Sequence, residues 1–141
     1  MYTYFADTSF WIALSSKGDQ YHRNAVSWSH LLVRTQCALV TTEAVLWEWM
    51  NAMSDAGTRR LATEGYRRCQ NDSRIEVVPF NTELIDAALR LYESRADKSW
   101  SLTDCLSFVV MKERNLVDAL STDHHFQQAG LRSVMLSEYN N

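Results

Sequence analysis

The chain has 141 residues, of which 46% are hydrophobic and 22% are charged, and these values are typical of one globular domain over residues 1–141. One proline and four glycines exclude a collagen-like or linker-rich chain, and an aromatic content of 11% argues against disorder. The net charge of −3 excludes a histone-like polycation, so a nucleic acid would have to be bound by a local patch or through metal ions.

The sequence also bears on the cellular compartment. Its apolar stretches are far shorter than the ~20 residues that span a bilayer. Asp7 interrupts the apolar N-terminal run, and no basic residue precedes it, so we do not interpret this run as a signal peptide. The three cysteines form neither a CxxC pair nor a disulfide framework. We therefore expect a soluble cytoplasmic protein with no membrane partner.

Short apolar or β-branched runs alternate with stretches of helical periodicity along the whole chain. This alternation predicts one α/β domain with a mainly parallel central sheet. The last of the long helices is apolar nearly all round, so we expect it to lie deep in the domain. The expected strands are 2–6, 38–40, 75–78, 116–120 and 133–136, and the expected helices are 10–14, 21–34, 41–56, 59–70, 81–95, 103–114 and 124–129.

Carboxylates follow the predicted strands at the edge where parallel sheets form their sites. Asp7 directly follows the first strand, Asp123 follows the fourth, and Asp104 lies in the first turn of the apolar helix. Acids held together would repel and take up protons unless a cation lay between them. Mg²⁺ and Mn²⁺ prefer oxygen ligands, and no Cys or His has the spacing of a zinc site. The pattern therefore favours an acidic site for a hard divalent cation.

Each of these acids also has a purely structural interpretation. Asp7 and Asp123 could cap the short helices that follow them. Asp104 could complement the dipole of its helix. Asp118 lies inside the predicted fourth strand, so we do not assign it to a metal.

The helix over 41–56 offers two acids, and we choose Glu48 over Glu43. Glu48 lies among small side chains, Ala44 and Ala52, at helical spacing, which predicts a packed rather than a solvated position. A buried Glu is rarely unpaired. Glu43 is in the first helical turn, where an interaction with the helix dipole explains it.

Four segments of the chain together resemble the PIN-domain family, and within it the VapC-like toxins of type II toxin–antitoxin systems. The likeness extends from about residue 2 to residue 136. It implies a three-layer fold, with a five-stranded parallel sheet in the order 3-2-1-4-5 and helices on both faces. The segments are Ala6-Asp7-Thr8-Ser9, the run from Thr41 to Glu48, the run from Ser101 to Phe108, and the run from Asp118 to Phe126.

The resemblance implies a metal-dependent endoribonuclease that hydrolyses RNA phosphodiester bonds. One or two Mg²⁺ or Mn²⁺ ions would lower the pKa of a water, orient it and neutralise the leaving oxygen. The small hydroxyl positions of the family, which support a coordinated water or a phosphate, match Thr8, Ser9 and Thr122. The four family acids, which would be catalytic and hold the metal, match Asp7, Glu48, Asp104 and Asp123, with Glu48 binding directly or through water.

The same resemblance implies partners. An RNA substrate, a cognate antitoxin protein and a second copy of the chain in a homodimer are expected. An arginine-rich helix could contact the RNA backbone, because phosphate contacts require Lys or Arg. A solvated face paired with Glu64 explains this helix equally well. The arginines concerned are Arg59, Arg60, Arg67 and Arg68.

Two features depart from the family pattern. His124 and His125 follow Asp123, and we expect them to be exposed on a short helix without a catalytic part, with a general acid or a metal ligand as the alternative. Trp47 and Trp49, which flank Glu48, are bulkier than the family leads us to expect. We expect these tryptophans to be mostly core, and any that is exposed becomes a candidate contact for an antitoxin or a second copy.

Three other functions fit the sequence less well. A non-catalytic PIN scaffold that acts through protein binding is the main alternative, and the retention of four acids argues against it. A phosphoacceptor receiver would need an Asp after the third strand, where Pro79-Phe80-Asn81 supplies none. A dinucleotide-binding domain would need a Gly-x-Gly-x-x-Gly after a strand, which the sequence lacks.

Overall fold

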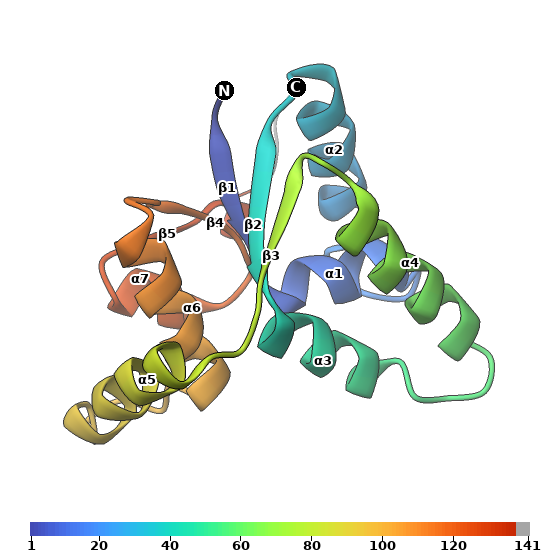
Figure 1. The fold of residues 1–141 in the computed structure, drawn as a ribbon. Helices are drawn as coiled ribbons and strands as arrows, with labels where there is room; N and C mark the ends of the chain where they lie inside the picture. Colours follow the sequence, from blue (N-terminus) through green and yellow to red (C-terminus); the bar gives the residue numbers. More distant parts are fainter. Residues whose placement is uncertain (138–141) are drawn as a thin grey trace.

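Five parallel strands form one sheet in the order β3-β2-β1-β4-β5 in the computed structural model, which describes residues 1–137 (Figure 1). This is the order that the family resemblance implies, so the predicted fold class is confirmed. Strand order reverses between β1 and β4, which is where open α/β sheets form their sites. The strands are β1 (Thr3–Ala6), β2 (Ala38–Thr42), β3 (Ile75–Val78), β4 (Asp118–Leu120) and β5 (Arg132–Ser133).

One layer of helices covers each face of the sheet (Figure 1). In the described residues, no helix is both long enough and apolar enough to cross a membrane. A single 3₁₀ turn, Val134–Leu136, follows β5. The first layer contains α1 (Thr8–Ser15), α2 (His22–Arg34), α3 (Glu43–Ala52) and α4 (Arg59–Asn71), and the second contains α5 (Thr82–Ser94), α6 (Leu102–Glu113) and α7 (His124–Gln128).

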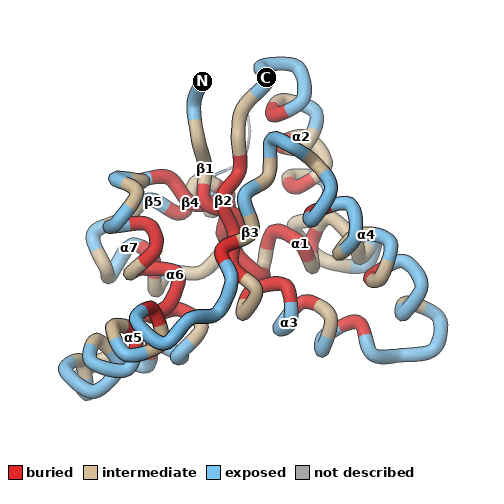
Figure 2. Tube along the Cα trace, in the orientation of Figure 1, coloured by how far each residue is buried: buried red, intermediate tan, exposed pale blue. Residues whose placement is uncertain are grey.

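The hydrophobic core lies between the sheet and the two helical layers (Figure 2). Phe5 on β1 and Leu120 on β4 are fully buried at the centre of the sheet. On α6, Cys105, Val110 and Met111 are also fully buried. The prediction that this helix lies deep in the domain is therefore confirmed, and Cys105 is a small core residue.

The predicted end of the third helix is wrong, because α3 stops at Ala52 rather than at residue 56. Side-chain hydroxyls take the carbonyls that a further helical turn would have used. Ser54 Oγ donates to the Asn51 carbonyl at 2.6 Å, and Thr58 Oγ1 donates to the Met53 carbonyl at 2.9 Å.

The strand expected over 133–136 is also wrong in extent. β5 has only two residues, Arg132 and Ser133, which pair with Asp118 and Ala119 of β4, and the apolar run continues as the 3₁₀ turn. Met135 in this turn is fully buried. The hydrophobicity of the run therefore reflects packing into the core rather than pairing in the sheet.

Gly65 allows α4 to pack closely against α3. A Cβ at this position would lie 2.4 Å from Cη2 of Trp49. The Trp49 ring is not free to move away, because it stacks on Trp11 at 5.6 Å between ring centroids and its Nε1 donates to Ser15 Oγ at 3.1 Å. Only glycine fits this contact without a shift of the packed ring.

We expect Gly65→Ala to lower the free energy of unfolding by about 1–3 kcal/mol, as overpacking does in other cores. The higher helix propensity of alanine offsets at most about 1 kcal/mol of this loss. Urea denaturation of the variant and the wild type measures the difference. Gly57→Ala is the control, because a Cβ there meets no atom within 4 Å. Equal stability of the two variants would contradict the close packing of α4 on Trp49.

Candidate active site

The candidate site lies at the carboxyl edge of the sheet, where β1 and β4 are neighbours. Ala6 pairs with Leu120 at the ends of these strands. The Asp7 N–H donates to the Leu120 carbonyl at 3.1 Å, which extends the β1–β4 pairing as far as the first acid. Asp7 and Ser121 are therefore held side by side, each directly after its strand.

The Asp7 carboxylate is buried and is held by two hydroxyls. Ser121 Oγ donates to Asp7 Oδ2 at 2.8 Å, and Ser9 Oγ donates to the same oxygen at 3.1 Å. Asp7 occupies the N-cap position of α1, but its side chain makes no capping hydrogen bond. The capping interpretation is therefore wrong for its carboxylate, which is turned to the site.

The pKa of Asp7 is raised from 3.8 to about 7, and burial is the largest cause. The neighbouring Asp104 carboxylate acts in the same direction as burial, whereas hydrogen bonds from Ser121, the Thr8 backbone and Ser9 act against it. Within residues 1–137 no Lys or Arg forms an ion pair with Asp7. A bound cation would supply the missing positive charge.

Asp104 combines a structural and a site position. Its N–H donates to Ser101 Oγ at 3.0 Å, and the Ser101 N–H donates to Asp104 Oδ2 at 3.0 Å, so the two residues form a capping box at the start of α6. The residue is only 7% exposed. The start of the helix therefore fixes the orientation of this acid.

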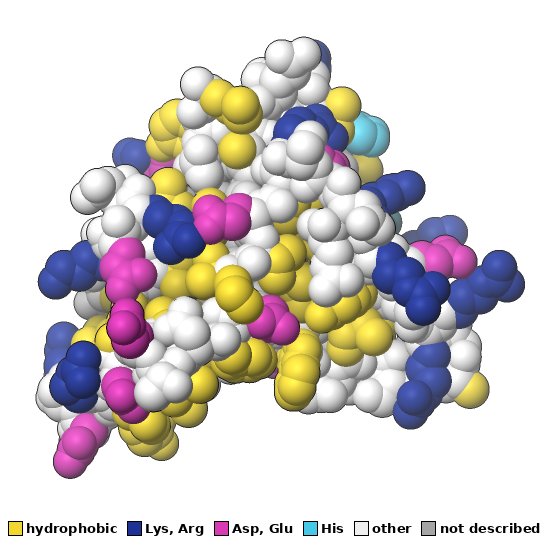
Figure 3. Space-filling view, viewed as in Figure 1, with side chains coloured by type: hydrophobic (Ala, Val, Ile, Leu, Met, Phe, Trp, Pro, Cys, Tyr) yellow, Lys and Arg dark blue, Asp and Glu magenta, His cyan; other side chains and the backbone are white. Residues whose placement is uncertain are grey.

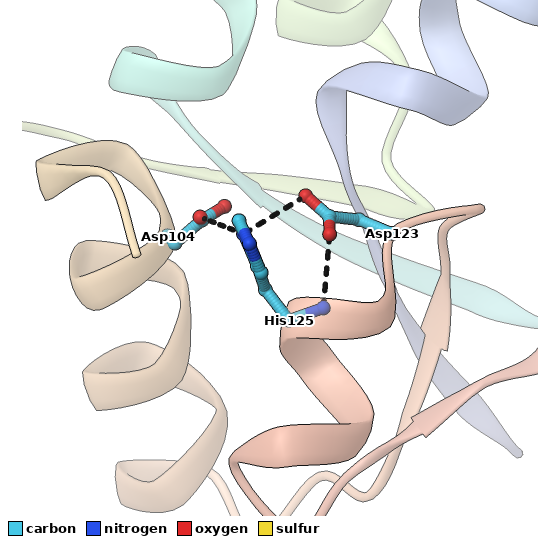
Figure 4. Close-up of side chains that lie close together, drawn as sticks. All are labelled: Asp104, Asp123 and His125. Carbon is cyan, nitrogen blue, oxygen red and sulfur yellow. Dashed lines mark hydrogen bonds and ion pairs between the residues drawn. The ribbon is translucent and has the colours of Figure 1, made fainter. Parts of the chain in front are cut away.

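Asp104, Asp123 and His125 point toward one another (Figure 4). Nδ1 of His125 lies 2.8 Å from Asp104 Oδ2 and 3.4 Å from Asp123 Oδ2. One ligand atom from each of the three residues lies within 4.8 Å of the other two. Asp123 also caps α7, as its structural interpretation predicts, because its Oδ1 accepts the His125 N–H at 2.9 Å.

The two histidines differ from each other. His124 is exposed, as expected, and its Nδ1 lies 3.2 Å from Gln127 Oε1. The expectation of an exposed residue outside the site is wrong for His125, because the first turn of α7 directs its ring between the two carboxylates. The sequence offered one signal for this, since Asp123 and His125 are two residues apart across a helix start.

Ser121 is the site residue that the sequence analysis missed. Its Oγ donates to Asp7 and accepts the Asp123 N–H at 2.9 Å, so a single buried hydroxyl joins the two acids. The available signal was its place directly after β4, which matches the place of Asp7 after β1.

The predicted supporting hydroxyls lie in the same region. Ser9 Oγ accepts the Thr122 N–H at 3.0 Å and so connects the loops after β1 and β4. Thr8 Oγ1 is buried and has no hydrogen-bond partner among the described residues. A buried hydroxyl beside Asp7 that lacks a protein partner fits a site that also holds water or an ion.

The prediction that Glu48 is packed is wrong. Glu48 is exposed on α3 and lies outside the Asp104–Asp123–His125 cluster. The buried face of α3 carries Val45, Leu46 and Trp49, and at 100° per residue Glu48 lies more than a quarter turn from its centre. Its small neighbours therefore mark an open face of the helix and not a tight contact. The expected role of Glu48 as a metal ligand stays a prediction.

The other two acids near these elements have structural partners. Glu43 Oε1 accepts the Phe80 N–H at 2.9 Å and ties the start of α3 to the segment after β3. Asp118, which we did not assign to a metal, is buried in β4, where it accepts from Arg132 Nε at 2.5 Å and from the Tyr2 hydroxyl. Neither residue belongs to the cluster at the site.

The donor set fits a hard divalent cation. Carboxylate oxygens are the ligands that Mg²⁺ and Mn²⁺ prefer, and Mn²⁺ also accepts an imidazole nitrogen more readily than Mg²⁺ does. Asp104 and Asp123 offer such oxygens within 4.8 Å of each other. Burial raises the pKa of Asp7, and a cation bound beside it would stabilise the ionised carboxylate.

A parallel 3-2-1-4-5 sheet with acids gathered at its switch point defines the class of protein. The model of the PIN domain matches residues 4–131, and the chain belongs to this family.

Curated relatives and solved structures agree with this assignment. The 23S rRNA-specific endonuclease VapC20, from two strains of Mycobacterium tuberculosis, is 29% identical over 131 residues, which cover 92% of this chain and 96% of the relative. The crystal structure of M. tuberculosis VapC20, a toxin that cleaves the sarcin–ricin loop, superposes with a TM-score of 0.80 at 25% identity, covering 92% of this chain and 96% of that chain. Rickettsia felis VapBC2, bound to a DNA fragment from its promoter, shares the fold with a TM-score of 0.62 at 16% identity, covering 90% and 92% of the two chains.

We expect Asp7→Asn to stabilise the metal-free protein at pH 8. The unfolded carboxyl ionises near 3.8 and the folded one near 7, so stability falls as the pH rises between these values and stays low above them. The gain in the free energy of unfolding is at most about 4 kcal/mol, and it disappears below about pH 4. Urea denaturation in EDTA at pH 4 and pH 8 measures it.

Asp118→Asn is the matched control. This buried acid is paired with Arg132, so the same substitution there should lower the free energy of unfolding. A less stable Asp7→Asn protein at pH 8 would contradict the effect of burial on Asp7.

Proposed function

We propose that this protein is a metal-dependent endoribonuclease that hydrolyses RNA phosphodiester bonds. One observation supports this most directly: three carboxylates gather at the switch point of the sheet, where within residues 1–137 no Lys or Arg pairs with any of them and the His125 imidazole faces two of them. Such a site is costly without a cation. A non-catalytic scaffold would have no use for it. The acids concerned are Asp7, Asp104 and Asp123.

These three acids would hold one or two Mg²⁺ or Mn²⁺ ions, with Glu48 binding directly or through water. When bound, the cation supplies a water of lowered pKa and neutralises charge on the leaving oxygen. The capping box keeps the Asp104 carboxylate oriented, and Ser121 does the same for Asp7. Because these contacts are already made, little reorganisation is needed when RNA binds.

The likeness to VapC20 supports a more specific function. VapC20 is named a 23S rRNA-specific endonuclease, and it matches this chain over 92% of its length. We therefore propose that the substrate is ribosomal RNA, with the sarcin–ricin loop as the first candidate. We also propose that the protein acts in the cytoplasm as a toxin that forms a homodimer and is neutralised by a cognate antitoxin.

We expect the purified protein to cleave RNA with Mg²⁺ or Mn²⁺ and not with EDTA. Asp7→Asn, Asp104→Asn and Asp123→Asn should each lower the rate at least about 100-fold, because each removes a charged ligand of the cation. The substrate is a hairpin that carries the sarcin–ricin loop, and a total RNA pool covers other sites. Glu43→Gln is the control, since Glu43 contacts the Phe80 backbone and not the cluster.

Isothermal titration of Mn²⁺ into the same variants reads the metal site without cleavage. If the wild type binds no divalent cation and cleaves no RNA, the enzyme is excluded and the scaffold remains. If it binds the cation and all three variants still cleave, the acids are not its ligands.

The arginines of α4 supply a surface for the RNA backbone, and we propose this role over a purely solvated face. Lys and Arg side chains gather on the α4 side of the molecule (Figure 3). Arg60 forms an exposed ion pair with Glu64 at 3.1 Å, and Arg59 donates to the Ser54 carbonyl at 2.6 Å. Arg67 is exposed and has no ion-pair partner within residues 1–137. It is therefore free to contact a phosphate, and Arg68 is exposed as well.

We expect Arg67→Gln to weaken RNA binding about 2- to 5-fold at 0.1 M salt and to reduce the salt dependence by about one phosphate contact. Binding is measured in the Asp7→Asn background with EDTA, so that no RNA is cleaved. Arg90→Gln is the matched control, because Arg90 is exposed on α5 in the opposite layer. Equal effects of the two substitutions would leave α4 as a solvated face.

A further inference from the structure

Trp47 differs from the other tryptophans of the chain because its side chain is open to solvent. It is 55% exposed, whereas the other four lie between 3% and 9%. An exposed indole forgoes the stabilisation that burial of a large aromatic group provides. Trp47 is on α3, which begins directly after β2 at the same edge of the sheet as Asp7.

A small hollow lies against Trp47. It has a volume of about 260 Å³ and is lined by Trp47, Met50, Asn51 and Tyr66. Phe80, which does not line the hollow, packs edge-on against the indole with ring centroids 5.5 Å apart and 74° between the rings. The indole is thus held in place beside a hollow too small for a helix of a partner protein and large enough for one planar group.

The hollow lies between α3, which supplies Trp47, Met50 and Asn51, and α4, which supplies Tyr66. α3 begins where β2 ends, and β2 is the neighbour of β1, after which Asp7 lies. Neighbouring strands are about 4.8 Å apart, so the start of α3 is roughly one strand spacing from Asp7. At 1.5 Å per residue, the α3 residues of the hollow lie roughly 6–12 Å further along the helix. On the far side, Tyr66 is followed by the exposed Arg67. An aromatic surface between a positive charge and a phosphate-cleaving site is how single-stranded nucleic acid is bound.

We propose that this hollow is a base pocket, in which an unpaired nucleobase next to the cleaved bond stacks on the Trp47 indole. The side-chain amide of Asn51 can both donate to and accept from the edge of that base. The pocket deepens the proposed function and rests on it, because the RNA bound here is the substrate. A stacked base would fix the register of the chain, so that one phosphodiester faces the acids.

Binding of RNA by the Asp7→Asn protein in EDTA tests the pocket. The probe is a hairpin with the sarcin–ricin loop, compared with a fully paired duplex. Trp47→Ala should weaken binding of the hairpin about 5- to 100-fold, as loss of one stacked base does. Trp47→Phe should retain most of the affinity, and Asn51→Ala should change the preference among bases. None should alter duplex binding.

Tryptophan fluorescence gives a second readout. Because Trp47 is far more exposed than the other tryptophans, acrylamide quenching reports mainly on it. The hairpin should shield the indole from acrylamide, and abasic sites placed along the loop should abolish this shielding at one position. That abasic substitution should weaken the parent protein and leave the Trp47→Ala variant unchanged, as expected of two partners in one contact.

Other outcomes overturn the pocket. Unchanged hairpin affinity in Trp47→Ala and Trp47→Phe, with no shielding by RNA, would exclude it. Loss of self-association in Trp47→Ala with unchanged RNA affinity would make Trp47 a contact between copies of the chain. A separate cleavage assay tests the proposed function: if the wild type cleaves no RNA with Mg²⁺ or Mn²⁺, that function fails. If the wild type and Trp47→Ala cleave equally well, the function stands and the pocket falls.

Discussion

The rest of the site depends on the cost of holding three carboxylates together, two of which are buried. Like charges at short range repel, and burial raises the pKa of Asp7. The protein meets this cost with partial charges: two hydroxyls on Asp7, the capping box on Asp104 and the N-terminus of α7 on Asp123. None of these three contacts supplies a full positive charge, and the His125 imidazole faces Asp104 and Asp123 but forms no ion pair with Asp7 within residues 1–137. The raised pKa of Asp7 shows that they fall short where burial is greatest.

The sheet makes this arrangement possible because it fixes where the loops begin. The pairing of β1 with β4 ends with Ala6 opposite Leu120, and both residues are fully buried. On the other side of β1, Thr41 Oγ1 donates to the Ala6 carbonyl at 2.8 Å and ties β2 to the same point. The acids therefore start from a rigid base. A small shift in strand register would separate Asp7 from Ser121 and remove the link to Asp123.

The fold and the three aspartates were predictable because their signals are local in the sequence. Alternating elements predict the parallel sheet, and the position directly after a strand or at a helix start marks Asp7, Asp104 and Asp123. Ser121 was missed, and for His125 the site was only the alternative, because their contacts join distant residues: Ser121 meets Asp7 across 114 positions, and His125 meets Asp104 across 21. Glu48 was misplaced for a different reason. Small neighbours on a helix occur both at tight contacts and at open faces, and only the packing of α3 distinguishes them.

The structural and the catalytic interpretations of the aspartates are not alternatives. Asp104 and Asp123 are helix caps and, on the proposed function, metal ligands, so the contacts that begin α6 and α7 also aim their carboxylates. Capping requires an oxygen acceptor, which asparagine keeps, whereas binding a divalent cation requires the charge. Asp7 has no capping contact to keep, and its ionised form is the one that burial opposes. Substitution of Asp7 therefore separates stability from activity, since it should stabilise the metal-free protein and abolish RNA cleavage.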